Sequence, residues 1–221
     1  MTAVPAIDGL QEGFQNYLRE GHFLADSPEL VPLTLALYRR LAGGNPVERT
    51  QLAVDLSLSL EQVNALLSEL PASTIDADEC GKIVAFGGLS LGPANHVFRI
   101  DGLELHTWCV FDALFLPQLL GKSATSITNC PTTAARIEIA LNPKAVLWSK
   151  PADPVMSIVA PDKESCCENL RGAFCNHVNF FADEQAFQAW ADGRPEVGHV
   201  SLKAAHRLAQ QRNFYRYGDQ F

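Results

Sequence analysis

The segment 97–117 constrains the fold most, because it joins a strand pattern to a helix pattern with no spacer between them. Its first half flanks Asp101-Gly102, a dipeptide typical of a tight hairpin turn, and therefore predicts two antiparallel strands. The almost entirely apolar residues that follow predict a helix that Pro117 stops or kinks. We expect a hairpin whose second strand leads directly into a buried helix.

The predicted helix begins with one thiol and one carboxyl, Cys109 and Asp112, in otherwise apolar surroundings. Residues three apart on a helix share a face, so the two groups are expected to point the same way. Helix N-terminal amides favour an anion, which predicts a lowered pKa for the Cys109 thiol. A carboxyl in apolar surroundings is expected to be protonated and able to donate its proton. The simple structural alternatives are a buried core cysteine and a first-turn acid.

Composition and charge exclude several classes of function. The 221 residues are 47% hydrophobic and 19% charged, which suits one large or two small globular domains. We find neither an apolar run of about 20 residues nor a signal-peptide pattern, so we expect a cytoplasmic protein without a membrane partner. A net charge of −8 argues against nucleic acid as a partner. Six cysteines are then expected to be free thiols in a reducing compartment.

Residues 27–70 predict three short helices with tight turns. The first begins at Ser27, next to a proline, and carries a leucine stripe. The third begins with a capping box at residues 59–62. Followed by strands, the three helices resemble a winged helix-turn-helix. The third helix, residues 60–70, contains no Lys or Arg for phosphate contacts, so DNA binding is disfavoured.

The predicted fold class is α+β, with a winged-helix-like three-helix domain ahead of a sheet-centred catalytic domain. We expect an N-terminal extension at 1–26, the helical domain at 27–80 and the catalytic domain at 81–221. Within the catalytic domain the pattern predicts two strands and then two helices, at residues 155–160, 175–181, 183–190 and 201–217.

The remaining cysteines leave several kinds of site to weigh. Structural zinc ligands are usually paired two to four residues apart, and Cys166-Cys167 with Cys175-x-His177 lacks that spacing. A redox dithiol requires a Cys-x-x-Cys motif, which the sequence does not contain. A hydrolase could combine His177 with the thiol and carboxyl of the helix start, but no glycine-rich nucleophile elbow surrounds that thiol.

Two motifs resemble those of the organomercurial lyases, the alkylmercury lyase family. Residues 108–117, Trp-Cys-Val-Phe-Asp-Ala-Leu-Phe-Leu-Pro, resemble the family's Trp-Cys-x-x-Asp-x-Leu-x-x-Pro segment. Residues 174–182, Phe-Cys-Asn-His-Val-Asn-Phe-Phe-Ala, resemble its second cysteine motif, Phe-Cys-x-His-Val-x-Phe-Phe. Residues 46–53 and Cys130 also fall in register, so the resemblance extends over about residues 27–205.

The resemblance implies an enzyme that cleaves the carbon–mercury bond of alkyl and aryl mercurials by protonolysis, giving a hydrocarbon and Hg(II). By the resemblance, Cys109 and Cys175 are the thiolates that bind mercury and Asp112 is the proton donor, while Cys130 is structural. Thiolates are the preferred ligands of a soft metal. We expect no organic or metal cofactor. Free small thiols would deliver the substrate and remove Hg(II), with mercuric reductase as the expected recipient.

The sequence departs from some family members at the second motif, where Cys175 is followed by Asn176 instead of a second cysteine. A vicinal pair occurs upstream at Cys166-Cys167. We hypothesise that this pair lies near the mouth of the pocket and captures mercurials or hands off the product. Because acidic and polar residues surround it, two idle surface thiols are the alternative.

A different class of protein, a thiol-based soft-metal sensor or transcriptional regulator with a winged helix, is the alternative function. A sensor would need cations on its third helix and would have no use for Asp112. Both features favour the enzyme.

Overall fold

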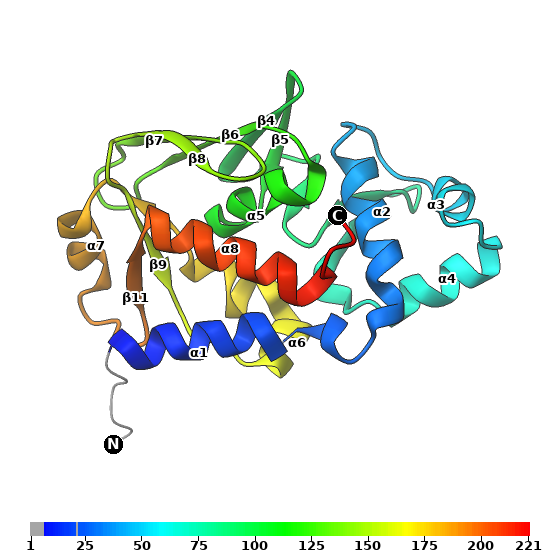
Figure 1. Ribbon diagram of the computed structural model, residues 1–221, viewed down its shortest axis with the longest axis horizontal. Helices are drawn as coiled ribbons and strands as arrows, with labels where there is room; N and C mark the ends of the chain where they lie inside the picture. Colours follow the sequence, from blue (N-terminus) through cyan, green and yellow to red (C-terminus); the bar gives the residue numbers. More distant parts are fainter. Residues whose placement is uncertain (1–6, 21) are drawn as a thin grey trace.

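The computed structural model describes residues 7–20 and 22–221 and shows two antiparallel sheets with helices packed around them (Figure 1). This confirms the expected mixture of helix and sheet. The larger sheet has eight strands, in spatial order β1 (Ile75–Ala77), β2 (Ile83–Phe86), β3 (Leu89–Ser90), β5 (Leu103–Thr107), β4 (His96–Ile100), β6 (Ala124–Asn129), β7 (Arg136–Leu141) and β8 (Val146–Lys150). The smaller sheet has the order β10 (Phe180–Phe181), β9 (Val155–Ile158) and β11 (Gly198–Ser201).

Several helices begin where a side chain accepts a hydrogen bond from a free backbone amide. The hydroxyl of Ser59 accepts from the amide of Gln62 at 3.1 Å, and the Asp183 carboxylate accepts from the amide of Ala186 at 2.8 Å. The α-helices are α1 (Ile7–Glu20), α2 (Val31–Leu41), α3 (Arg49–Leu56), α4 (Leu60–Glu69), α5 (Val110–Leu120), α6 (Lys163–Ala173), α7 (Glu184–Ala191) and α8 (Leu202–Tyr217). Four single 3-10 turns are η1 (Phe23–Ala25), η2 (Pro28–Leu30), η3 (Ala72–Thr74) and η4 (Cys175–His177).

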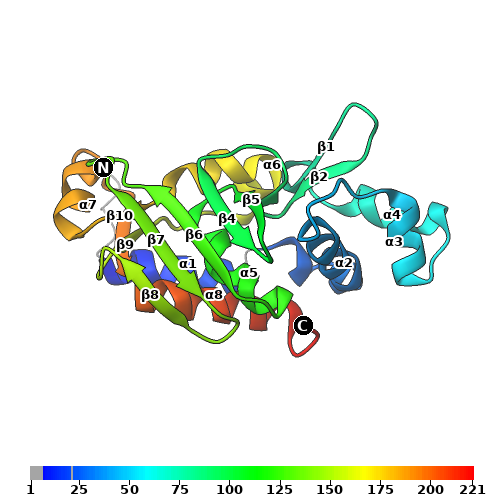
Figure 2. The same ribbon diagram turned by 90° about the horizontal axis from the view of Figure 1, so that it is seen from above.

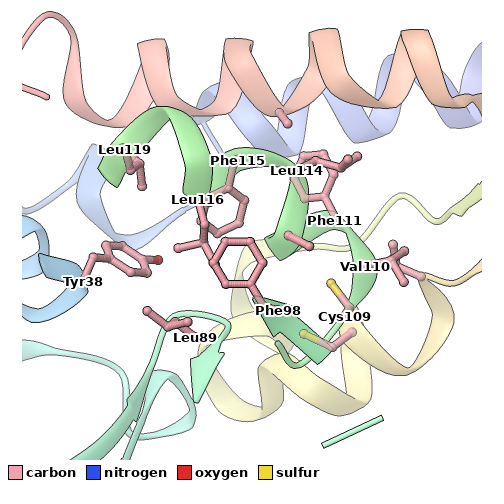
Figure 3. Packing of buried hydrophobic residues seen from close by; sticks show 14 of the residues in the cluster. Tyr38, Leu89, Phe98, Cys109, Val110, Phe111, Leu114, Phe115, Leu116 and Leu119 are labelled. Atoms are coloured by element: carbon pink, nitrogen blue, oxygen red, sulfur yellow. The ribbon is translucent and has the colours of Figure 1, made fainter. Parts of the chain in front are cut away.

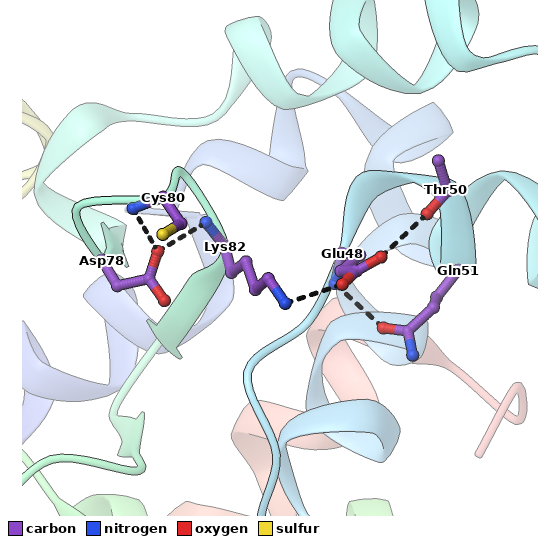
Figure 4. A network of polar contacts seen from close by, with 6 residues as sticks. All are labelled: Glu48, Thr50, Gln51, Asp78, Cys80 and Lys82. Atoms are coloured by element: carbon purple, nitrogen blue, oxygen red, sulfur yellow. Dashed lines mark hydrogen bonds and ion pairs between the residues drawn. The ribbon is translucent and has the colours of Figure 1, made fainter.

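The three helices predicted between residues 27 and 70 are present as α2, α3 and α4. The start of the first was predicted too early, because residues 28–30 form the separate turn η2 and the Ser27 side chain makes no capping hydrogen bond. The start of α3 is tied to the turn between β1 and β2 by an ion pair of 2.7 Å between Lys82 and Glu48 (Figure 4). Cys80 lies exposed in that turn.

The predicted hairpin and helix are confirmed as β4, β5 and α5. Asp101 and Gly102 both have positive φ, +52° and +78°, as the tight turn between the two strands requires. Of the two expected effects of Pro117, a stop is wrong, because α5 continues to Leu120 and ends at Gly121 in the left-handed conformation. Proline lacks an amide hydrogen, so α5 lacks one backbone hydrogen bond at this position but keeps its buried packing.

Helix α5 lies at the centre of the molecule, between the larger sheet and α8, and α1 packs beside α8 (Figures 1 and 2). Nearly all of its side chains are buried, and Phe111, Leu114 and Phe115 contribute to one continuous apolar core (Figure 3). This core also includes side chains of α1 and α2. The predicted domain boundary near residue 80 stays a prediction.

One prediction for the region after residue 150 is wrong, and one helix there was not predicted. Residues 175–181 were expected to form a strand, but 175–177 form the turn η4 and only Phe180–Phe181 pairs with β9. Residues 163–173 form helix α6, which the sequence analysis did not predict, and its backbone is non-helical at Asn169. In the described part of the chain, no helix combines the length and the apolar character that a membrane crossing requires.

Candidate active site

Cys109 occupies the junction between β5 and α5, where it is the N-cap residue of the helix. Its backbone is extended, with φ −142° and ψ 173°, and its amide donates a hydrogen bond of 2.8 Å to Oδ2 of Asp112. In return, the sulfur of Cys109 accepts from the amide of Asp112, which completes a capping box. Both residues are buried. The predicted juxtaposition of thiol and carboxyl is therefore present, and the first-turn role considered for Asp112 is also correct.

Cys175 reaches the same place from η4, the turn that follows α6. One ligand atom from each of Cys109, Asp112 and Cys175 lies within 4.8 Å of the others, and all three residues are buried. The three predicted site residues thus lie together, although 66 residues separate the two thiols in the sequence. No other group of three His, Cys, Asp or Glu ligands is found among the described residues.

Burial dominates the electrostatics of the carboxyl. It raises the pKa of Asp112 from the ordinary 3.8 to about 6. Hydrogen bonds from Cys109 and the nearby cations Arg212 and Arg216 act in the opposite direction and limit the increase. Asp112 is therefore a carboxyl that holds its proton to a higher pH than an exposed aspartate.

The predicted lowering of the Cys109 pKa is wrong. Burial raises the pKa of this thiol well above 9.0, and the adjacent Cys175 and Asp112 raise it further. The hydrogen bond from the Asp112 amide favours the thiolate, as the helix-start argument assumed, but it is the weakest of these effects. The surroundings of Cys109 therefore keep its thiol protonated until a metal displaces the proton.

Two consecutive glycines leave room for side chains of the site: Gly88 lies against the Asp112 carboxyl and Gly87 against the Tyr38 hydroxyl. A Cβ atom on Gly88 would lie 2.3 Å from the carboxyl carbon of Asp112, and Gly88 has φ +105°. A Cβ atom on Gly87 would lie 2.3 Å from the hydroxyl of Tyr38, which donates a hydrogen bond of 2.8 Å to the Gly87 carbonyl. These glycines were not predicted to belong to the site, because only the folded β2–β3 connection brings them to α5.

A cavity of about 50 Å³ adjoins the cluster and is lined by Asp112 and Cys175, whereas the fully buried Cys109 is not part of its lining. A single water requires roughly 10–15 Å³ of such space, so the cavity can hold a small ligand. Cys166 and Cys167 also line it, which confirms their predicted position near the pocket. Cys166 is only 5% exposed, so the alternative of two surface thiols is wrong for this residue.

The cations on the cavity wall were not predicted from the sequence. Arg212 of α8 lies over the ring of Phe115 at 3.4 Å and approaches the hydroxyl of Tyr38 at 3.3 Å. Arg216 is one helical turn further along and also lines the cavity. Their spacing of four residues indicated a shared face of α8, but nothing in the sequence indicated that this face meets the start of α5.

Within residues 7–20 and 22–221, the alternative sites that the sequence left open are not assembled. His177 is not part of the cluster, and its Nε2 lies 3.1 Å from the carbonyl of Gly172, so the Cys-His-Asp hydrolase arrangement is absent from the described residues. Cys130 is buried beyond the end of β6, and its amide donates to the Ala135 carbonyl at 2.8 Å. Its structural role stays a prediction.

Comparisons with known proteins agree with the motifs at these positions. The MerB family model, described as alkylmercury lyase, matches residues 89–213. An alkylmercury lyase of Pseudomonas putida is 37% identical over 180 residues, which cover 81% of this chain and 82% of that protein. The chain belongs to the alkylmercury lyase family. A second member, from Staphylococcus epidermidis, is 33% identical over 174 residues, covering 79% of this chain and 78% of that protein.

The fold of this alkylmercury lyase family member is also found in a solved structure, the crystal structure of the mercury-bound form of MerB2. The two folds superpose with a TM-score of 0.76, and the match covers 93% of this chain and 99% of that chain at 19% sequence identity. The family model includes the cluster of Cys109, Asp112 and Cys175 within its matched range.

Proposed function

We propose that this chain is an organomercurial lyase, which cleaves the carbon–mercury bond of alkyl- and arylmercury compounds by protonolysis. The observation that carries the proposal is the buried cluster of two thiols and one carboxyl, whose ligand atoms lie within 4.8 Å of one another. Membership of the alkylmercury lyase family supports the same reaction. The alternative of a soft-metal sensor is not supported, because the relatives are lyases and α4 carries no Lys or Arg.

Cys109 and Cys175 are the mercury ligands in this proposal. Thiolate sulfur is the preferred ligand of a soft metal. An organomercury cation therefore binds each sulfur as the thiolate, and the thiol proton is released on binding. The raised pKa of Cys109 therefore does not prevent binding, since binding itself removes the proton. Two thiolates on one mercury atom increase the electron density on the attached carbon and make it more basic.

Asp112 is the proton donor. Its carboxyl proton moves to the substrate carbon, the carbon–mercury bonding pair becomes the new carbon–hydrogen bond, and the hydrocarbon leaves. Hg(II) then remains on the two thiolates, and Asp112 becomes a carboxylate. With a pKa of about 6, roughly a tenth of the carboxyl is protonated at pH 7 in the free protein. The anionic complex formed on the two thiolates raises this fraction.

We further propose that turnover needs no organic or metal cofactor and that free small thiols deliver the substrate and carry Hg(II) away. Mercuric reductase is the proposed recipient, and the proposed compartment is the cytoplasm. The proposed winged-helix-like arrangement of α2, α3 and α4 is accessory to the reaction, because its side chains do not belong to the thiol–carboxyl cluster.

Benzene release from phenylmercury in excess small thiol tests these roles. We expect wild type and Cys80→Ser to turn over, because Cys80 is exposed in the β1–β2 turn and plays no part in the cluster. Cys109→Ser and Asp112→Asn should each lose at least 100-fold in rate, since a missing thiolate or proton donor removes a reacting group. Tight mercury binding without benzene from wild type would contradict the proposal.

A further inference from the structure

A second pair of thiols lines the same cavity as the proposed catalytic groups. Cys166 and Cys167 are consecutive residues of α6, and both lie on the cavity wall together with Cys175 and Asp112. The chemistry proposed above uses neither of them. Two soft-metal ligands in the cavity that receives Hg(II) therefore need an explanation.

The two thiols of the pair differ in their exposure to solvent. Consecutive residues of a helix project about 100° apart, so the two side chains occupy different parts of the cavity wall. Cys166 is buried and close enough to Tyr17 and Cys175 for both to affect its ionisation. Cys167 is more exposed and lies near Lys163 and Asp26, which form an ion pair at the surface.

The backbone that carries the two thiols is fixed. The hydroxyl of Ser73, in η3, lies 3.0 Å from the carbonyl oxygen of Cys166 and 2.9 Å from that of Cys167. This contact joins α6 to a segment 93 residues away in the sequence. The position of the two residues on the cavity wall is therefore held by a contact between distant parts of the chain.

Burial raises the pKa of Cys166 to about 11, so it is a neutral thiol near pH 7 and adds no negative charge to the cavity before mercury arrives. Burial also raises the pKa of Cys167. Metal binding releases thiol protons, so both residues can still accept Hg(II) by exchange.

We propose that Cys166 and Cys167 form an exit path for Hg(II), in which the metal moves from the catalytic thiolates to Cys166 and then to Cys167. This proposal rests on the proposed function. In each step the incoming sulfur forms a mercury–sulfur bond and gives up its proton, while one existing mercury–sulfur bond breaks and the released sulfur takes up a proton. Mercury stays divalent throughout, so no oxidant or reductant is required.

The test uses a thiol that cannot enter the cavity. Protein loaded with one equivalent of Hg(II) is mixed with bead-bound thiols, which can reach mercury only where it is exposed, and mercury transfer to the beads is timed. We expect Cys166→Ser and Cys167→Ser to slow transfer at least tenfold. Cys80→Ser, which removes an exposed thiol outside the cavity, should match wild type.

Two further measurements keep the outcomes distinct. Removal of Hg(II) from each variant by a small dithiol confirms that each carried the same amount of metal. Cys167→Ser is the variant least able to disturb packing because its side chain is partly exposed. Equal rates of mercury transfer in wild type and both variants would overturn the exit path alone. Variants that slow only the first release of benzene would do the same. Absence of benzene release from wild type would overturn the proposed function and the exit path together.

Discussion

Replacement of Gly88 by alanine should move the proposed proton donor without touching any reacting atom. The new Cβ would lie 2.3, 2.4 and 2.7 Å from Cγ, Oδ1 and Oδ2 of Asp112. Carbon atoms in contact prefer about 3.5–4.0 Å, so the carboxyl has to shift by roughly 1 Å. The Gly88 backbone cannot easily retreat, because its carbonyl accepts from the Trp108 amide at 2.9 Å.

Two costs follow from this substitution. Positive φ at a residue with a Cβ atom costs on the order of 1–3 kcal/mol of folding free energy. Displacement of Asp112 also weakens its 2.8 Å hydrogen bond with the Cys109 amide, and a bond to a charged group contributes about 1.5–3 kcal/mol. A misplacement of about 1 Å at a reacting group lowers the rate by about 100-fold. We therefore expect Gly88→Ala to lose about 100-fold in benzene release and roughly 2–5 kcal/mol in stability.

Gly102→Ala is the matched control, because Gly102 also has positive φ, +78°, but a Cβ there would meet nothing within 4 Å. It should lose a similar backbone contribution to stability and retain its rate of benzene release. Urea denaturation and phenylmercury turnover measure the two effects separately. Equal activity of Gly88→Ala and Gly102→Ala would refute the argument that Gly88 positions the carboxyl.

Two other predictions concern stability. Because the pKa of Asp112 rises from 3.8 to about 6 on folding, ionisation destabilises the folded state progressively as pH rises between these values. Asp112→Asn should be more stable than wild type by up to about 3 kcal/mol above pH 6 and lose this advantage below pH 4, and a pH-independent difference in urea midpoints would count against the reasoning. Phe14→Ala should lower the free energy of unfolding in urea by about 3–5 kcal/mol. The Phe14 ring packs on the rings of Phe111 and Phe174, with centroids 5.3 and 5.6 Å apart. The control is Phe214→Ala, because Phe214 is exposed, and it should lower the free energy of unfolding by less than about 0.5 kcal/mol. Similar losses in the Phe14 and Phe214 variants would show that α1 does not stabilise the core.

Features set by neighbouring residues were predictable from the sequence. The Asp101-Gly102 turn, the capping box at Ser59 and the approach of Cys109 to Asp112 each depend on residues within four positions of one another. The motif at residue 175 predicted the second thiol through the family resemblance, and the fold brings it to the first.

Features set by tertiary packing were not predictable in the same way. Helix α6 was missed because Asn169 and Gly172 interrupt its helical pattern, and Asn169 is indeed non-helical. The predicted direction of the Cys109 pKa was wrong because the helix start is a local feature, whereas complete burial depends on the elements that cover it. Arg212 reaches the site only because α8 packs on α5.

The capping box at the start of α5 also has a consequence for the proposed reaction. Before proton transfer, the Cys109 amide donates to a neutral carboxyl, and afterwards it donates to a carboxylate. Hydrogen bonds to an ionised acceptor are roughly twice as strong as neutral ones. The amide, the start of α5 and the cations Arg212 and Arg216 therefore stabilise Asp112 more as its proton leaves. Because these groups are fixed before the substrate binds, they lower the barrier without reorganising, which is the electrostatic contribution expected of a preorganised site.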